Sequence, residues 1–249
     1  MSFQDHFSRV SDRYARYRPH YPAALFEWLA SLTPRHDLAW DCATGNGQAA
    51  LGLSTYFQHV VATDASADQV ANAAIGANIE YRVAPAEHSG LQTGSADAVT
   101  CAQALHWLPR DAFYAEVRRV LRAEGVVAVW GYHIPLVGDE AVDRHIRQFH
   151  DEVVGPYWPP ARQIVLDRFT TIEFPFRELD APPFDMRCHW TLDAFAKYLG
   201  TQSATDRYRQ AHAGHDPVPA FVEAVIGPWG GIETARDVVF PLFTRAGRA

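Results

Sequence analysis

The chain has 249 residues, of which 48% are hydrophobic and 20% charged, enough apolar material for one large domain with a sizeable core. Its formal net charge of −7 disfavours a nucleic-acid partner, because such partners are bound through clustered positive charge. No apolar run approaches bilayer-spanning length, and the opening stretch MSFQDHFSRVSDRYARYRP mixes charges with aromatics. We therefore expect a cytoplasmic protein that acts on a small molecule, with no membrane partner. The oligomeric state is left open.

Five short segments rich in Val, Ile and Ala alternate with helix-like segments in the first half of the chain. They are residues 38–42, 59–64, 79–84, 96–101 and 125–132. Their near-continuous apolar character is typical of strands buried on both faces. The clearest helix is 111–125, with an acidic start, late basic residues and Gly125 as the expected stop. This alternation predicts an α/β, doubly wound, mostly parallel sheet, with ligands bound at the carboxyl ends of its strands.

The pattern changes after residue 132. Residues 139–154, 191–213 and 217–227 look helical, 168–190 look extended, and 237–246 look like a strand whose Pro241 suggests an edge or bulge. We expect the last strands to extend the sheet and the helices to cover it. Without a repeat or long linker, we predict one domain over 1–249, made of an N-terminal cap segment (1–36), a cofactor-binding core (37–135) and a C-terminal part (136–249).

The turn after the first strand, DCATGNGQ (41–48), has the form of a ligand-binding glycine loop. Gly45 and Gly47 let the backbone approach a ligand and open a helix whose N–H groups face it. The segment 45–50 also fits a dinucleotide fingerprint, G-x-G-x-x-A. A pyrophosphate would be repelled by Asp41, however, whereas the ammonium group of S-adenosylmethionine would be attracted by it.

Further strand ends carry residues suited to the rest of this cofactor. Asp64 ends the second strand, where a carboxylate can accept hydrogen bonds from both ribose hydroxyls. Ala86 and Glu87 follow the third strand and are placed to line an adenine edge, although a solvated loop is the alternative. The stretch AQALHWL (102–108) follows the fourth strand, where we expect the reactive group.

The succession DCATGNGQ, VVATD, APAEH, SADAVTCAQALHW and VLRAEGVVAVWG resembles the class I S-adenosylmethionine-dependent methyltransferases, over roughly residues 1–135. The His-Trp pair after the fourth strand, with Phe7, Tyr14 and RPHYP (18–22), looks like the trans-aconitate methyltransferase-like (methyltransferase type 11) branch. The resemblance implies a Rossmann-like sheet of seven strands with an antiparallel last strand and a helical cap.

The resemblance also implies roles for particular residues. Asp41, Gly45 and Gly47 would hold the methionine part, Asp64 the ribose, and Gln103 would lie near the sulfonium. Ala43 stands where the family has its first loop glycine, and we expect its small methyl group to be tolerated. The complete predicted cofactor-binding set is Tyr14, Tyr21, Asp41, Ala43, Gly45, Gly47, Gln48, Asp64, Ala65, Ala86, Glu87, Gln103 and Trp107.

The acceptor side is predicted from fewer residues. Arg18 is expected to bind an acceptor carboxylate, and His106 to shape the pocket more than to act as a base, since a carboxylate needs no proton removed. Further wall candidates are Tyr132, His189, Trp190, Arg207 and Tyr208. The favoured function is O-methylation of a small organic acid. The alternatives are a neutral phenol, amine or lipid-like acceptor, a non-catalytic cofactor-binding protein, or an NAD(P)-binding oxidoreductase.

No metal site is expected. The sequence has twelve scattered histidines without an HExxH pattern, and its cysteines, Cys42, Cys101 and Cys188, form no CxxC pair. We expect all three to be buried, reduced thiols.

Overall fold

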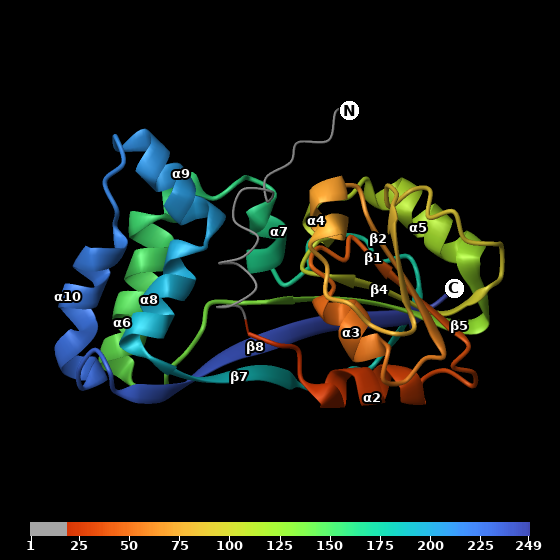
Figure 1. Cartoon of the computed structure of the whole chain (residues 1–249), viewed down its shortest axis with the longest axis horizontal. Coiled ribbons are helices and arrows are strands. Elements are labelled where there is room, and N and C mark those ends of the chain that lie inside the picture. The colour runs from red at the N-terminus through yellow and green to blue at the C-terminus, as the bar shows by residue number, and fades with distance from the viewer. Residues whose placement is uncertain (1–18) are drawn as a thin grey trace.

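The computed structural model describes residues 19–249 and contains a mixed sheet whose central part is parallel (Figure 1). The strand order is β3-β2-β1-β4-β5-β8-β6, with β7 paired to β8 outside this path. The first five strands are parallel to one another and confirm the doubly wound α/β prediction. They are β1 Leu38–Cys42, β2 His59–Asp64, β3 Ile79–Val83, β4 Ala96–Ala102 and β5 Leu121–Tyr132.

Helices cover both faces of this parallel part. On one face α2 (Ala23–Ser31) and α3 (Gln48–Leu53) pack with Ala39, Val60 and Trp130 of the strands. On the other, α5 (Arg110–Val120) packs Phe113 and Val117 against alternate residues of the same strands. The short helix α4 (Ala67–Ala71) follows β2. Because both faces are covered, the central strands are apolar throughout.

The boundary between α5 and β5 differs from the prediction. The helix ends at Val120 and not at Gly125, because Leu121 is already extended and pairs with Ala96 of β4. The register then shifts in a bulge before Ala98 pairs with Val126, and Glu124 within it has a left-handed φ of 69°. Helix propensity therefore yields to strand pairing over residues 121–124.

The sheet has eight strands where seven were expected, because the last strand, β8 (Ala235–Arg248), is long enough to pair along two stretches. Its second half is antiparallel to β5 and to β6 (Arg177–Leu179), and its first half is antiparallel to β7 (Phe184–Thr191). The antiparallel last strand is thus as predicted.

Pro241 lies inside β8, one residue before the stretch that pairs with β5 begins at Leu242. Its carbonyl accepts from the His133 N–H, just past the end of β5. In an antiparallel strand the N–H and C=O of one residue face the same neighbour. The missing N–H of Pro241 therefore faces the place where β5 has ended, and no ladder bond is lost.

The first half of β8 and β7 carry the helical cover, which stands to one side of the parallel part in Figure 1. A third apolar core joins these two strands to the cover helices, and the predicted helical stretches correspond to them. The cover elements are α6 Glu140–Gln148, the π-helix η2 Phe149–Val153, the 3-10 helix η3 Gly155–Tyr157, α8 Leu192–Gly200, α9 Ser203–Ala211 and α10 Val218–Trp229. The helix α7 (Arg162–Leu166) leads back from this cover toward the parallel strands, where Val165 packs into the core under α5.

Candidate functional site

The turn after β1 alternates residues with left-handed backbone. Ala43, Gly45 and Gly47 have φ values of 54°, 56° and 85°. Gly47 caps α3, and a Cβ atom there would lie 2.1 Å from the hydroxyl oxygen of Tyr81. Of these three residues Ala43 alone carries a side chain, so its left-handed backbone is the strained one. The expectation that its methyl group is tolerated stays a prediction.

Asp41 lies beneath this turn and is completely buried. Its carboxylate accepts from the Thr44 hydroxyl at 2.5 Å and from the Thr100 hydroxyl at 2.7 Å. Burial raises its pKa to about 6, against the lowering effect of the two threonines. The carboxylate therefore ties the glycine turn to β4 and places an acid that titrates near neutral pH directly under it. Thr44 and Thr100 were missed in the sequence, where a threonine three residues after Asp41 was the available signal.

Asp64 reaches from the end of β2 to the same turn. One carboxylate oxygen accepts from the Gly45 N–H and the other from the Ser66 N–H, both at 2.9 Å. Ser66 in turn caps α4, while Ala65 between them is exposed. Gln48 is half-buried in the first turn of α3. Asp64 thus orients two backbone segments at the place where a ribose would lie.

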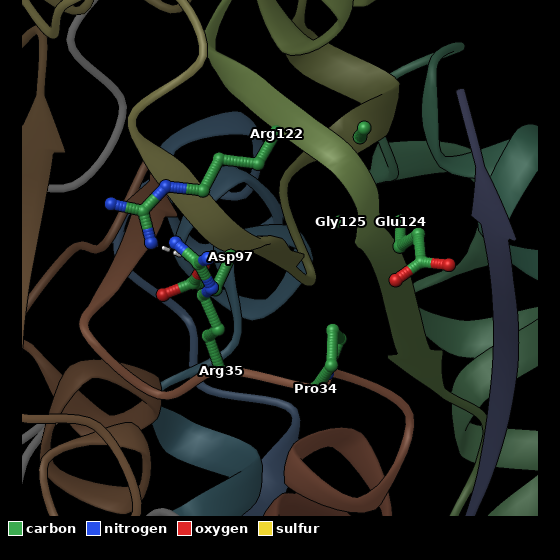
Figure 2. Close-up of a pocket in the computed structure, with 7 residues that line it drawn as sticks. Pro34, Arg35, Asp97, Arg122, Glu124 and Gly125 are labelled. Carbon is green, nitrogen blue, oxygen red and sulfur yellow. Dashed lines mark hydrogen bonds and ion pairs between the residues drawn. The ribbon is translucent and has the colours of Figure 1, made fainter.

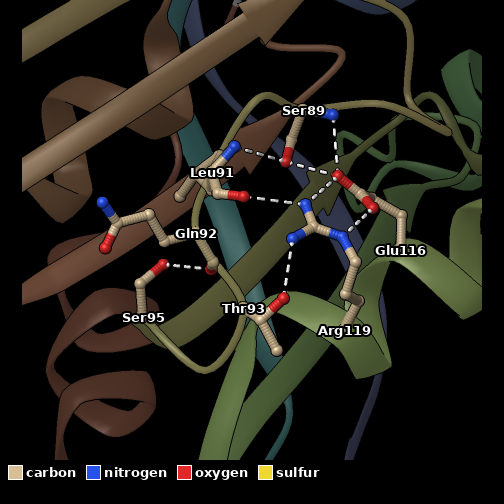
Figure 3. Close-up of polar contacts among 7 residues, drawn as sticks. All are labelled: Ser89, Leu91, Gln92, Thr93, Ser95, Glu116 and Arg119. Atoms are coloured by element: carbon tan, nitrogen blue, oxygen red, sulfur yellow. Dashed lines mark hydrogen bonds and ion pairs between the residues drawn. The ribbon is translucent and has the colours of Figure 1, made fainter.

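An ion pair between the half-buried Arg119 and the buried Glu116 holds the loop that follows β3. Glu116 of α5 accepts from the backbone and hydroxyl of Ser89, and Arg119 binds Glu116 and the Leu91 carbonyl (Figure 3). Its bond to Arg119 comes first among the causes that lower the pKa of Glu116 to about 2, so this carboxylate is ionised at neutral pH. These contacts fix the middle of the loop, just after Ala86, which is buried, and Glu87, which is exposed.

Gln103 follows β4 with a left-handed φ of 54°, unusual for a residue that is not glycine. Its N–H donates to the Trp130 carbonyl at 2.7 Å, and its side-chain oxygen accepts from the Tyr132 N–H at 3.2 Å. These bonds to β5 hold the strained residue at the carboxyl edge of the sheet, where backbone strain is often functional.

His106 and Trp107 form a 3-10 turn, η1 (Leu105–Trp107), after Gln103. The ring of His106 is 7% exposed and lies 4.7 Å from that of Trp107, which is more exposed. Burial, with a contribution from the charge of Arg162, lowers the pKa of His106 to about 3, so the ring is neutral at physiological pH.

The remaining predicted site residues separate into three groups. Tyr21 packs edge-on against Trp130, at 5.5 Å between ring centroids, and Tyr14 and Arg18 lie outside the described residues. Tyr132 and Trp190 both pack against Phe240 within the core of the cover.

Three polar wall candidates lie in the cover. His189 is exposed and its Nδ1 lies 2.9 Å from the Asp237 carboxylate, and its role as a pocket wall stays a prediction. Tyr208 stacks on His212 at 4.2 Å, and Arg207 is half-buried on the same helix. Of the cysteines, Cys42 and Cys101 are buried as expected, Cys188 is half-buried, and all three are free thiols.

A hollow of about 250 Å³ lies at the amino ends of the strands, at the opposite end of the sheet from the glycine turn (Figure 2). Arg122 lies across it and pairs with Asp97 at 2.7 Å and with Asp37 at 2.9 Å. Arg35 and Glu124 also line the hollow, which is at the end of the sheet away from the glycine turn. This hollow is therefore no continuation of the candidate site.

Within residues 19–249 no helix is long and apolar enough to cross a membrane. The same range contains no group of three or more His, Cys, Asp or Glu side chains that could hold a metal ion.

Comparison with known proteins shows which protein family has this sequence and fold. Residues 40–129 match the model of a methyltransferase domain family. A solved structure from Anaeromyxobacter dehalogenans, provisionally called a type II methyltransferase, is 41% identical, covers 93% of this chain and 97% of its own, and superposes with a TM-score of 0.88. A protein of Dictyostelium discoideum, provisionally called a methyltransferase, is 29% identical over 247 residues, 97% of this chain and 94% of its own. A probable S-adenosylmethionine-dependent methyltransferase of Saccharomyces cerevisiae is 30% identical over 135 residues, about half of each chain (50% and 46%).

A Rossmann-like sheet with a glycine turn between two strand-end carboxylates is typical of proteins that bind a nucleoside-containing cofactor. The relatives show to which family of such proteins this chain belongs. The chain belongs to the class I S-adenosylmethionine-dependent methyltransferases. Its cofactor is S-adenosylmethionine, and the dinucleotide and non-catalytic alternatives are set aside.

Proposed function

We propose that the cofactor lies across the carboxyl ends of β1 to β4, held by the predicted set of residues. Asp64, already bonded to the turn, would accept from the ribose hydroxyls, and Ala86 with Glu87 would flank the adenine. Asp41 would supply the negative charge that the ammonium group of the methionine part requires. The residues present fit this group, because both carboxylates converge on one glycine turn.

We propose further that the methyl group goes to a carboxylate oxygen of a small organic acid. The observation that carries this choice is the burial of His106, which is 7% exposed and whose pKa is lowered to about 3 by that burial. A phenol or ammonium acceptor must lose a proton, and so weak a base gives little help, whereas a carboxylate is already nucleophilic. Bound S-adenosylmethionine supplies a methyl group on a positively charged sulfur, so the carboxylate provides the electron pair of the new bond and no proton moves.

The protein's own contribution is then orientation and exclusion of water. Holding two reactants in line contributes up to roughly 7–11 kcal/mol in favourable cases. Gln103, fixed to β5, and the neutral ring of His106 would form the wall beside the reacting carbon. Arg18 stays a predicted positioning residue for the acceptor, in keeping with the trans-aconitate-like resemblance.

The neutral aromatic or lipid-like acceptor is the second candidate. Its wall was expected from Trp107, Tyr132 and Trp190, and two of these are packed on Phe240. Packing in the core of the cover accounts for them without a ligand, which leaves this candidate weaker.

The test is turnover of methyl-labelled cofactor with polycarboxylates and with neutral aromatics, on the parent and on Arg18→Ala. We expect the acids to be methylated and the variant to lose that activity. Methylation of neutral acceptors alone, undiminished in the variant, would overturn the proposed acceptor. Calorimetry with S-adenosylhomocysteine, NAD and NADP separately checks the cofactor site, and only the first should bind.

A further inference from the structure

The Asp41 carboxylate is enclosed by the protein, although we assign to it the charge that attracts the ammonium group of the cofactor. The residue is 0% exposed. Its oxygens are each bound by a hydroxyl group, Oδ2 by Thr44 at 2.5 Å and Oδ1 by Thr100 at 2.7 Å. The backbone of Ala50 in α3 supplies a further hydrogen bond. A carboxylate enclosed in this way acts on a ligand above the turn through its charge and not through direct contact.

The two threonines come from different elements that meet at Asp41. Thr44 is in the glycine turn and is 9% exposed, whereas Thr100 is on β4, directly opposite Asp41 in the register, and is 0% exposed. A hydroxyl that donates to an ionised carboxylate makes a charge-assisted hydrogen bond, which favours the charged form of the acid. Burial favours the neutral form. The two hydroxyl groups therefore counteract the cost of keeping a charge beneath the turn.

Four other titratable groups influence Asp41 or are influenced by it, and none of these four stabilises its charge. Asp64 at the end of β2 is a second acid, and its charge raises the pKa of Asp41. Burial raises the pKa of the thiols of Cys42 and Cys101 and of the Tyr81 hydroxyl on β3, so these three groups are neutral near pH 7. The hydrogen bonds described above are therefore the contacts that favour the charged carboxylate.

We infer that Thr44 and Thr100 are positioning residues for the cofactor, because they hold the Asp41 carboxylate charged and fixed beneath the glycine turn. The inference rests on the proposed function, in which the ammonium group of the methionine part lies above this turn. It adds two residues outside the predicted cofactor-binding set, and it assigns their effect to the methionine part alone. The adenosine part should bind equally well without either hydroxyl group.

Replacing each threonine by valine removes the hydroxyl group and nearly keeps the shape of the side chain. In the unliganded protein, Thr44→Val and Thr100→Val should each raise the pH at which Asp41 is half ionised by about one unit, since a hydrogen bond to the charged form is lost. A pH titration followed by NMR of isotopically labelled aspartate carboxyl groups measures this midpoint. Asp41→Asn identifies the signal that belongs to Asp41.

Cofactor binding should follow the same shift. Starting from a parent pKa of about 6, a shift of about one unit should weaken S-adenosylhomocysteine binding about fivefold at about pH 6 and less than about twofold at about pH 7.5. The second ligand is 5′-methylthioadenosine, which has the same adenosine and sulfur but no amino-acid part. Its affinity should stay within about twofold of the parent at both pH values. General damage to the site would instead weaken both ligands at both pH values.

Thr63→Val is the matched control. Thr63 lies on the neighbouring strand β2, is 0% exposed, and its hydroxyl accepts from Trp40 Nε1 at 2.9 Å. The variant therefore loses a buried hydroxyl as Thr100→Val does, but its Asp41 midpoint should not move. Thr100→Ser keeps a hydroxyl and should titrate like the parent. If Thr100→Val does not fold, Thr44→Val in the turn provides the same comparison.

The outcomes separate this inference from the proposed function. An unchanged midpoint in a folded valine variant would overturn the role of that threonine, and an equal shift in Thr63→Val would overturn both roles. The cofactor site would still stand if the parent binds S-adenosylhomocysteine. A shifted midpoint with parental S-adenosylhomocysteine affinity at about pH 6 would overturn the placement of the ammonium group above the turn, and the inference with it.

Discussion

The two ends of the same parallel strands have been built in opposite ways. At the amino end, Arg122 neutralises Asp37 and Asp97, and the Asp97 carboxylate also accepts from two backbone N–H groups. At the carboxyl end, Ala43 and Gln103 have a left-handed backbone, and the buried His106 Nδ1 has no hydrogen-bond partner among residues 19–249. At an end of the sheet that serves only stability, charged side chains can all be satisfied by ion pairs and hydrogen bonds. Backbone strain occurs at both ends, at Glu124 and at Gln103, so the arrangement of the charged groups is what distinguishes them.

Of the variants considered, Gly47→Ala should cause the largest loss of stability and cofactor binding at the carboxyl ends of the strands. The left-handed backbone costs about 1–2 kcal/mol for a residue with a side chain, and the clash with Tyr81 adds about 1–3 kcal/mol. Urea unfolding should show this loss of stability together with lost S-adenosylhomocysteine binding. Gly45→Ala is the control, since its Cβ would meet nothing nearer than 3.8 Å and only the first cost applies. Equal losses in the two variants would contradict the role of Tyr81.

Asp64→Ala should weaken S-adenosylhomocysteine affinity by about 1.5–3 kcal/mol, the cost of losing hydrogen bonds to a charged group. The variant loses the predicted ribose acceptor and also the anchor of Gly45 and Ser66. Asp68→Ala, an exposed acid on α4, should bind like the parent in the same calorimetry. A folded Asp64→Ala with parental affinity would show that the cofactor lies elsewhere.

Arg122→Met tests the amino end. The buried Asp97 carboxylate keeps its two backbone donors but loses its cation, which should cost about 1–3 kcal/mol of unfolding free energy. S-adenosylhomocysteine affinity should not change at a temperature where the variant is folded. Loss of cofactor binding in the folded variant would mean that the two ends are coupled.

The raised pKa of Asp41, about 6, makes cofactor binding depend on pH. The ammonium group of the cofactor favours the ionised carboxylate, so affinity should rise about tenfold between pH 5 and pH 7. Asp41→Asn should bind more weakly and lose this pH step. In the unliganded protein the sign is opposite, because the folded state holds the proton more tightly than the unfolded chain. The free energy of unfolding should fall as pH rises from about 4 to about 6.

Ala43→Gly should have the smallest effect and sharpen the argument about strain. Relief of the left-handed backbone, about 1–2 kcal/mol, is largely offset by the greater freedom of glycine in the unfolded chain, about 0.4–1 kcal/mol. We expect unchanged or slightly increased stability by urea unfolding and unchanged cofactor affinity. A clear loss of stability would show that the methyl group contributes more by packing than the backbone costs.

The local sequence pattern was sufficient to predict many of the residues at the carboxyl ends of the parallel strands. Asp41 and Asp64 lie at the ends of strands with clear apolar runs, Gly45 and Gly47 follow the first of them, and the carboxyl ends of parallel strands meet at one edge. The composition of each strand end could therefore be read without knowing any distant contact. The backbone strain at Ala43 could not be predicted in this way, because the sequence does not reveal the φ angle of an alanine.

Tertiary structure decided everything that depends on segments distant in the chain. The end of α5 at Val120 followed from pairing of Leu121 with β4, and the eighth strand from the length of β8, which pairs in two places. Arg162 and His150 are ordinary surface-type residues in the sequence. Arg162 comes near His106 only because β8 carries the cover and α7 returns from it to the sheet. Sequence periodicity reports which face of an element is buried, and only the packing of the elements determines which buried faces meet.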